Sequence, residues 1–306
     1  HAAASAAFGL MANLRLPSSG IAALLFAVHP VHVEAVTGVV GRAELLCALF
    51  CFAGAAAFDG CSSLRPLPAL VRPCLAACVV LCFAGAVLSK ETGVTLLGTL
   101  AVAELAVHWP ARGLRGGLAA AVARGMLLVA CALGYAAMRL LLMRPEGEAI
   151  SFEAASLAKS QLIRRAENPL TFVEGRLAWW LSVCRVNAEY ARLLLWPSRL
   201  SIEYSYDCVP MASTLLESAN LLPLLLIAVC LAIGITTLYR APTSDHTRRT
   251  CVAAAWLLMP WFPISHVPLR LGTLVAERTL YLPSVGAILL AVNALRPSTP
   301  HRTGAW

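Results

Sequence analysis

Long apolar segments recur along this chain, and they limit its fold more than any other feature. A helix that crosses a bilayer needs about 17–25 predominantly apolar residues. Several segments fall in or near that range, and the shorter ones are expected to continue as helix into their flanks. In residue numbers they are 1–14 (the end of a helix expected to start before His1), 18–29, 43–58, 73–89, 92–108, 118–142, 217–239, 250–266 and 280–296. The repetition predicts an all-α fold, a polytopic membrane bundle with about nine membrane helices across residues 1–306.

The composition agrees with a membrane protein and argues against other classes. Charged residues make up 13% of the 306 residues, about half their share in soluble domains. The net charge of +8 does not indicate nucleic-acid binding, because many basic residues lie in short gaps between apolar segments. The eleven cysteines include no Cys-x-x-Cys pair, so no disulfide framework is expected. No metal site is expected either, because Pro30 breaks the helix that would align His29 with His32.

Arginine residues indicate how the chain is oriented in the membrane. They collect in gaps at 13–18, 59–72, 108–117, 240–249 and 296–302, which the positive-inside rule assigns to the cytosol. Residues 176–196 resemble a further span but contain Arg185, Glu189 and Arg192, each costing roughly 3 kcal/mol at a bilayer centre. We therefore expect an amphipathic helix in the membrane interface, and only then do all the gaps face one side. Residues 144–215 then form one long non-cytosolic excursion.

The polar clusters fall on the opposite side from those gaps, in segments 29–42, 89–91, 144–215 and 266–281. The first segment holds His29 and, after a proline, His32 and Glu34, which are able to hydrogen-bond a sugar or each other. Arg42 begins the next apolar segment, where a guanidinium can bind phosphate through two hydrogen bonds. A surface pair between Arg42 and Glu44 is the alternative.

Two further motifs place charge at the bilayer boundary. Ser89-Lys90-Glu91-Thr92-Gly93 joins two apolar segments almost without a loop. Lys90 is suited to bind a lipid phosphate as a point charge, or else to pair with Glu91 and close the hairpin. Glu277, Arg278 and Tyr281 lie in apolar surroundings, where charges need partners, so a role in holding the bundle together is the alternative there. The stretch 202–207 adds aromatic and acidic residues, a weak signal for stacking on a sugar.

These motifs carry a family resemblance. His29-Pro-Val-His-Val-Glu-Ala-Val with Val40-Gly-Arg-Ala-Glu-Leu-Leu, then Leu88-Ser-Lys-Glu-Thr-Gly, then Ala276-Glu-Arg-Thr-Leu-Tyr-Leu-Pro-Ser-Val-Gly closely resemble the transmembrane and tetratricopeptide-repeat-containing O-mannosyltransferases of the endoplasmic reticulum. The resemblance implies a multi-pass GT-C fold in that membrane, with its active site on the lumenal face. It implies dolichyl-phosphate mannose as donor, no cofactor, and Ser or Thr acceptors in secretory or cell-surface proteins, typically cadherin-type domains.

The resemblance also assigns roles to the polar residues. It implies that Arg42, Lys90 and Arg278 bind the donor phosphate, while the sugar or these basic groups are oriented by His29, His32, Glu34, Glu44, Glu91, Glu277 and Tyr281. The family's catalytic acid is expected upstream of His1 and its tetratricopeptide repeats beyond Trp306, so we expect a fragment. A truncated, non-catalytic membrane scaffold or lipid-binding component is the alternative. A transporter is disfavoured, because the charges collect at one face.

Overall fold

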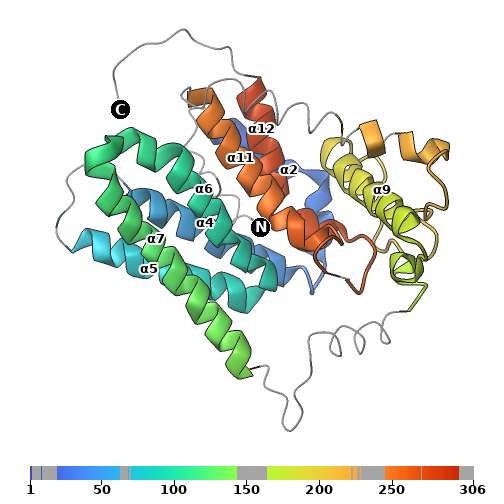
Figure 1. Ribbon diagram of the computed structural model, residues 1–306, viewed down its shortest axis with the longest axis horizontal. Helices are drawn as coiled ribbons and strands as arrows, with labels where there is room; N and C mark the ends of the chain where they lie inside the picture. The colour runs from blue at the N-terminus through green and yellow to red at the C-terminus, as the bar shows by residue number, and fades with distance from the viewer. Residues whose placement is uncertain are drawn as a thin grey trace.

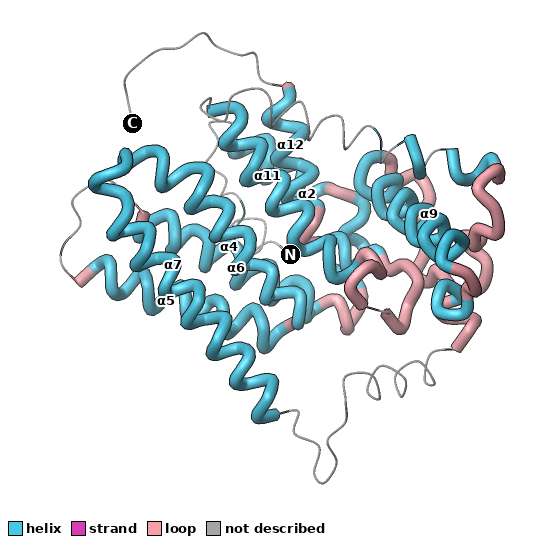
Figure 2. The backbone as a smooth tube through the Cα atoms, viewed as in Figure 1, coloured by secondary structure: helices cyan, strands magenta, loops and turns pink. Residues whose placement is uncertain are grey.

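The protein is described by a computed structural model over residues 1, 8, 19–62, 68, 70–142, 164–221, 223–225, 228, 245–269 and 271–295. Throughout these residues the regular structure is helical and no strand occurs (Figure 2). The expected all-α fold is therefore confirmed for this part of the chain.

Most helices follow the apolar segments, but the expected gap at 108–117 is helical from Trp109 onward, and segment 92–108 is divided into three helical pieces. The α-helices are α2 (Ser19–Val28), α3 (Val33–Thr37), α4 (Arg42–Cys61), α5 (Val71–Ser89), α6 (Thr95–Ala103), α7 (Trp109–Leu142), α9 (Arg176–Leu195), α11 (Asp245–Trp261) and α12 (Ser284–Ala294). Short helical turns join them: η1 (Pro30–His32), η2 (Glu91–Val94), the π-turn η3 (Glu104–His108), η4 (Pro169–Phe172), η5 (Ser218–Asn220), η6 (Phe262–Ile264) and η7 (Glu277–Leu280). The turns η1, η2 and η7 carry the three motifs of the sequence.

Several helices are long and apolar enough to cross a membrane. Among the described residues there are three, Arg42–Cys61, Val71–Ser89 and Leu118–Leu141, or four if the bent pair Ser19–Val28 and Pro30–Thr37 is one span. Pro30 has no N–H for the helix ladder, and the pair bends by 53° there. The expected break of the helix at Pro30 is therefore confirmed, and the chain resumes as helix beyond it. Segments 1–14 and 217–239 lie largely outside the described residues.

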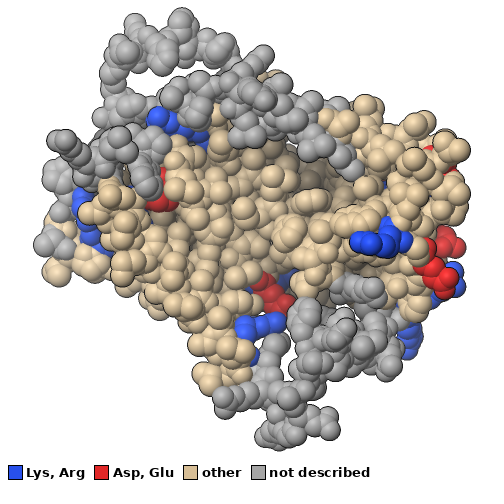
Figure 3. All heavy atoms as spheres, in the orientation of Figure 1, with Lys and Arg blue, Asp and Glu red and all other residues tan. Residues whose placement is uncertain are grey.

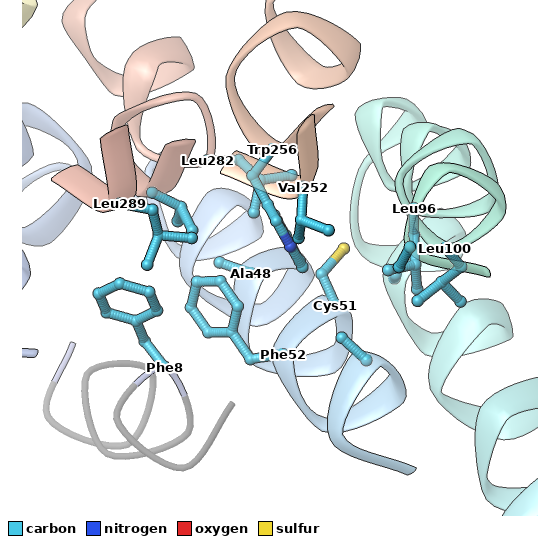
Figure 4. Close-up of a cluster of buried hydrophobic side chains, with 14 of the residues drawn as sticks. Phe8, Ala48, Cys51, Phe52, Leu96, Leu100, Val252, Trp256, Leu282 and Leu289 are labelled. Atoms are coloured by element: carbon cyan, nitrogen blue, oxygen red, sulfur yellow. The ribbon is translucent and has the colours of Figure 1, made fainter. Parts of the chain in front are cut away.

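The main core joins helices that are distant in sequence. Figure 1 shows α4, α5, α6 and α7 side by side, with α11 and α12 packed next to them. Figure 4 shows the side chains at their centre, where Phe52 of α4 and Trp256 of α11 meet with ring centroids 5.7 Å apart. Gly286 permits the close approach of α12 to α11, because a Cβ atom there would lie 2.1 Å from the backbone nitrogen of Leu257.

A second core forms around α9, the helix that the sequence predicts over 176–196. Val183, Val186 and Leu193 of this helix pack against Val31 and Leu280 from two of the motif segments. The charges of α9 are satisfied by protein groups at the same time. The buried Arg185 donates to the Asn220 side chain at 2.8 Å, to the Pro210 carbonyl at 3.0 Å and to Glu217 at 2.5 Å.

The charged residues separate toward two ends of the bundle. Figure 3 shows a broad belt of uncharged surface between groups of charged atoms. At one end, Asp59 lies 3.0 Å from His108, and the Asn293 side chain lies within 3.4 Å of the His246 carbonyl. The first contact joins the arginine-containing gaps at 59–72 and 108–117, and the second joins the gap at 240–249 to the last turn of α12. The other end, here called the motif end, gathers residues 29–42, 89–94 and 266–281.

Candidate active site

An ion pair connects the first and third motifs at the motif end. Glu34 lies in the first turn of α3, and its Oε1 lies 2.5 Å from Nη1 of Arg278. Its second oxygen accepts the backbone N–H of Arg278 at 2.9 Å, which fixes the start of η7. The Arg278 side chain is 29% exposed and that of Glu34 only 11%. The cation is therefore oriented by a carboxylate that lies deeper than itself.

A second ion pair repeats this arrangement with the remaining motif. Lys90, in the connection between α5 and η2, contacts Glu44 in the first turn of α4. The Lys90 side chain is 26% exposed and that of Glu44 only 4%. Burial and then the nearby Arg278 guanidinium lower the pKa of Lys90 to about 8, although Glu34 opposes the shift. All four charged groups thus form one cluster, here called the charge cluster.

A cleft of about 240 Å³ opens beside the charge cluster and is here called the first cleft. Glu34 and Arg278 line it together with Glu203 and Tyr204 from the predicted sugar-stacking stretch. The cleft offers carboxylates, a guanidinium and an aromatic ring, the groups that bind hydroxyls and anions. Nowhere in the described part of the chain do three His, Cys, Asp or Glu side chains converge as metal ligands.

Glu277 holds the loop of residues 201–205, which borders this cleft. Its Oε1 accepts the backbone N–H of Ser201 at 2.7 Å and the hydroxyl of Tyr204 at 2.6 Å. Glu277 itself is buried in η7. Burial, followed by the Glu277 carboxylate, raises the pKa of Tyr204, so its phenol remains a hydrogen-bond donor.

His29, His32 and Tyr281 lie behind the cleft rather than in its lining. His29 caps η1 by accepting from the Val31 N–H, and its Nε2 lies 3.1 Å from the Leu194 carbonyl of α9. His32 lies 2.8 Å from the Ser284 hydroxyl and packs 4.5 Å, centroid to centroid, from the Tyr281 ring. The contacts of these three residues join α9, η1 and α12.

The remaining predicted residues are at the surface of the motif end. Arg42 is exposed in the first turn of α4, and its guanidinium has no ion-pair or hydrogen-bond partner among the described residues. Glu91 pairs with Arg139, the last basic residue of α7, at 2.8 Å. Sequence reasoning missed Arg139, although an arginine in the last turn of an apolar helix is a signal of a boundary group.

Comparison with known proteins identifies the family. Residues 158–231, which include α9 and the loop with Tyr204, match the family model described as Protein O-mannosyl-transferase TMTC, DUF1736. Protein O-mannosyl-transferase TMTC3 of Mus musculus is 33% identical over 303 residues, covering 96% of this chain. The chain belongs to the TMTC protein O-mannosyl-transferase family. TMTC4 of Homo sapiens is 32% identical over 96% of this chain, and TMTC1 of Homo sapiens is 29% identical over 90%.

The chain spans only part of each of these TMTC relatives. It covers 32% of mouse TMTC3, 40% of human TMTC4 and 32% of human TMTC1. No solved structure matches it. The expected family is confirmed, and the motif end lies within the portion that the relatives share with this chain.

Proposed function

We propose that this chain forms the donor-binding end of a protein O-mannosyltransferase that takes mannose from dolichyl-phosphate mannose. The observation that supports this most directly is the charge cluster, in which Lys90 and Arg278 from separate motifs converge and Arg278 lines the first cleft. The names of the relatives supply the reaction class, transfer of mannose to a protein oxygen. The proposed acceptors are Ser or Thr residues of secretory-pathway proteins, including cadherin-type domains.

The arrangement of the charge cluster suits a departing lipid phosphate. In this reaction the acceptor oxygen bonds to C1 of mannose, the bond from C1 to the phosphate oxygen breaks, and the phosphate keeps the electron pair. Cations that already point at the developing charge stabilise it most effectively. Lys90 and Arg278 are each more exposed than the carboxylate that orients them, so both cations are accessible to an anion. Arg42, whose guanidinium has no partner among the described residues, supplies a third cation.

The proposed placement in the membrane follows from the two ends of the bundle. The motif end faces the lumen of the endoplasmic reticulum, and the arginine-containing gaps face the cytosol. We propose a GT-C arrangement in which α9 lies at the lumenal interface. The exposed side chains of Leu177, Trp180, Leu195 and Trp196 support this, because tryptophan and leucine favour that depth. The carboxylate that takes the proton from the acceptor hydroxyl is proposed to lie upstream of His1.

The test uses the full-length protein that contains this chain, with donor and acceptor varied separately. Lys90→Ala and Arg42→Ala should each lower kcat/KM for dolichyl-phosphate mannose by on the order of 100-fold, as loss of one transition-state cation or donor commonly does. Arg72→Ala is the matched control, because Arg72 is an exposed arginine at the opposite end of the helix that leads to Lys90. Transfer within threefold of wild type in both motif variants would remove the phosphate-binding assignment. A folded wild-type protein that transfers no mannose would favour a membrane scaffold instead.

A further inference from the structure

A second cleft lies on the other side of the loop that borders the first. It measures about 540 Å³ and is lined by Glu189, Arg192, Arg199, Leu200 and Tyr204, among others. Tyr204 lines both clefts, so residues 201–205 form the partition between them. We propose that this second cleft is the binding subsite for the acceptor polypeptide, an inference that rests on the function proposed above.

The partition is fixed from both sides, so the two clefts keep a constant relation. Glu277 holds Ser201 and Tyr204 from beneath. On the far side, the Arg192 guanidinium is oriented by Glu189 at 2.5 Å and donates to the Arg199 carbonyl at 3.0 Å. The partition therefore places a molecule in the second cleft at a set distance from the charge cluster, as transfer between two substrates requires.

The lining of the second cleft suits a polypeptide better than a lipid chain. Its volume lies within the range of about 300–1,000 Å³ typical of ligand pockets, whereas the first cleft is smaller. Arg199 is exposed and its guanidinium has no partner among the described residues, so it is able to donate to acceptor carbonyls or carboxylates. Leu200, 39% exposed, offers an apolar contact beside it. The charged pair of Glu189 and Arg192 would leave an acyl or isoprenoid chain poorly matched.

The experiment measures transfer by the full-length protein at varied acceptor concentration, using a secreted cadherin-type domain as acceptor. Arg199→Glu should raise the KM for the acceptor about tenfold, equivalent to one lost charge-assisted hydrogen bond. The KM for the donor and kcat should change less than about twofold. Leu200→Ser gives a second variant with the same expected direction, and both side chains are exposed, so folding should survive. Arg176→Glu, an exposed arginine at the other end of α9, is the matched control.

The outcomes separate this inference from the proposed function. An unchanged acceptor KM in both variants, with transfer intact, overturns the acceptor subsite and leaves the donor site standing. A donor KM that rises as much as the acceptor KM assigns the second cleft to the lipid-linked donor and also overturns the acceptor subsite. If wild-type protein transfers no mannose, the proposed function fails. Binding of the same acceptor domain to the full-length protein without donor then decides whether the second cleft binds the acceptor. Arg199→Glu must weaken that binding, and unchanged binding overturns the acceptor subsite.

Discussion

Replacing Glu104 by alanine should destabilise the protein strongly, because it leaves Arg124 charged and unpaired. Nε and Nη2 of Arg124, in α7, donate to the two carboxylate oxygens of Glu104 in η3 at 2.6 Å and 2.5 Å. Their side chains are only 9% and 7% exposed. Removing one member of such a buried pair costs about 3–5 kcal/mol. The expected fall in Tm is on the order of 10 °C.

The double replacement separates charge burial from packing. Glu104→Met combined with Arg124→Met removes both charges while keeping comparable volume, and such replacements of buried pairs are commonly neutral or stabilising. The Tm values of wild type, the two single variants and the double variant, measured in one detergent, form a double-mutant cycle. Gel filtration of each purified protein checks that it is folded. The exposed pair of Glu91 and Arg139 is the control, since Glu91→Ala should cost under about 1 kcal/mol. Single variants that melt with wild type, or a double variant as unstable as the sum of its singles, would refute the reasoning.

Three further predictions concern the motif end and the helix packing. Lys90, with its pKa of about 8, should lose its proton above pH 8, so kcat/KM for the donor should fall about tenfold per pH unit there. Lys90→Arg should move this decline to higher pH because a guanidinium stays charged, and a flat wild-type profile up to pH 9.5 or so would contradict the assignment. Gly286→Ala should lower Tm, since its Cβ would lie 2.1 Å from the α11 backbone, whereas Gly125→Ala meets no atom within 4 Å and should change stability by at most about 1 kcal/mol. Tyr204→Phe removes a hydrogen bond to Glu277 and should speed limited proteolysis of the partition loop without lowering Tm of the bundle; unchanged cleavage would count against the role of that bond.

Features that depend on local sequence could be predicted well. Apolar length located the helices, and Pro30 marked the break after α2. The charges in residues 176–196 argued against a span, and a helix forms there over Arg176–Leu195. Charges in apolar surroundings also required partners, and Glu34 and Arg278 are indeed paired across 244 positions. The place of α9 in the membrane interface stays a prediction.

Features that depend on how helices are rotated against one another could not be predicted. Arg185 lies in the same helix as Glu189 but pairs with Glu217 after a long loop, because α9 turns its face toward η5. Arg124 meets Glu104, 20 positions before it, only because α7 packs back against η3 and α6. Hydrophobic periodicity gives the position of such residues along a helix, yet it does not give the partner that tertiary packing brings to them.

Exposure distinguishes the two ion pairs of the charge cluster from the buried pair of Arg124 and Glu104. In the pair of Arg124 and Glu104, cation and carboxylate are almost equally buried, so the charges serve only each other. In the charge cluster, Lys90 and Arg278 are each more than twice as exposed as the carboxylates beneath them. A buried carboxylate under an exposed cation keeps the cation oriented before any ligand arrives, and a phosphate can then bind without reorganising the site. Because this asymmetry occurs in both motif pairs, and the pair of Arg278 and Glu34 lines the first cleft, we infer that the motifs serve anion binding as well as packing.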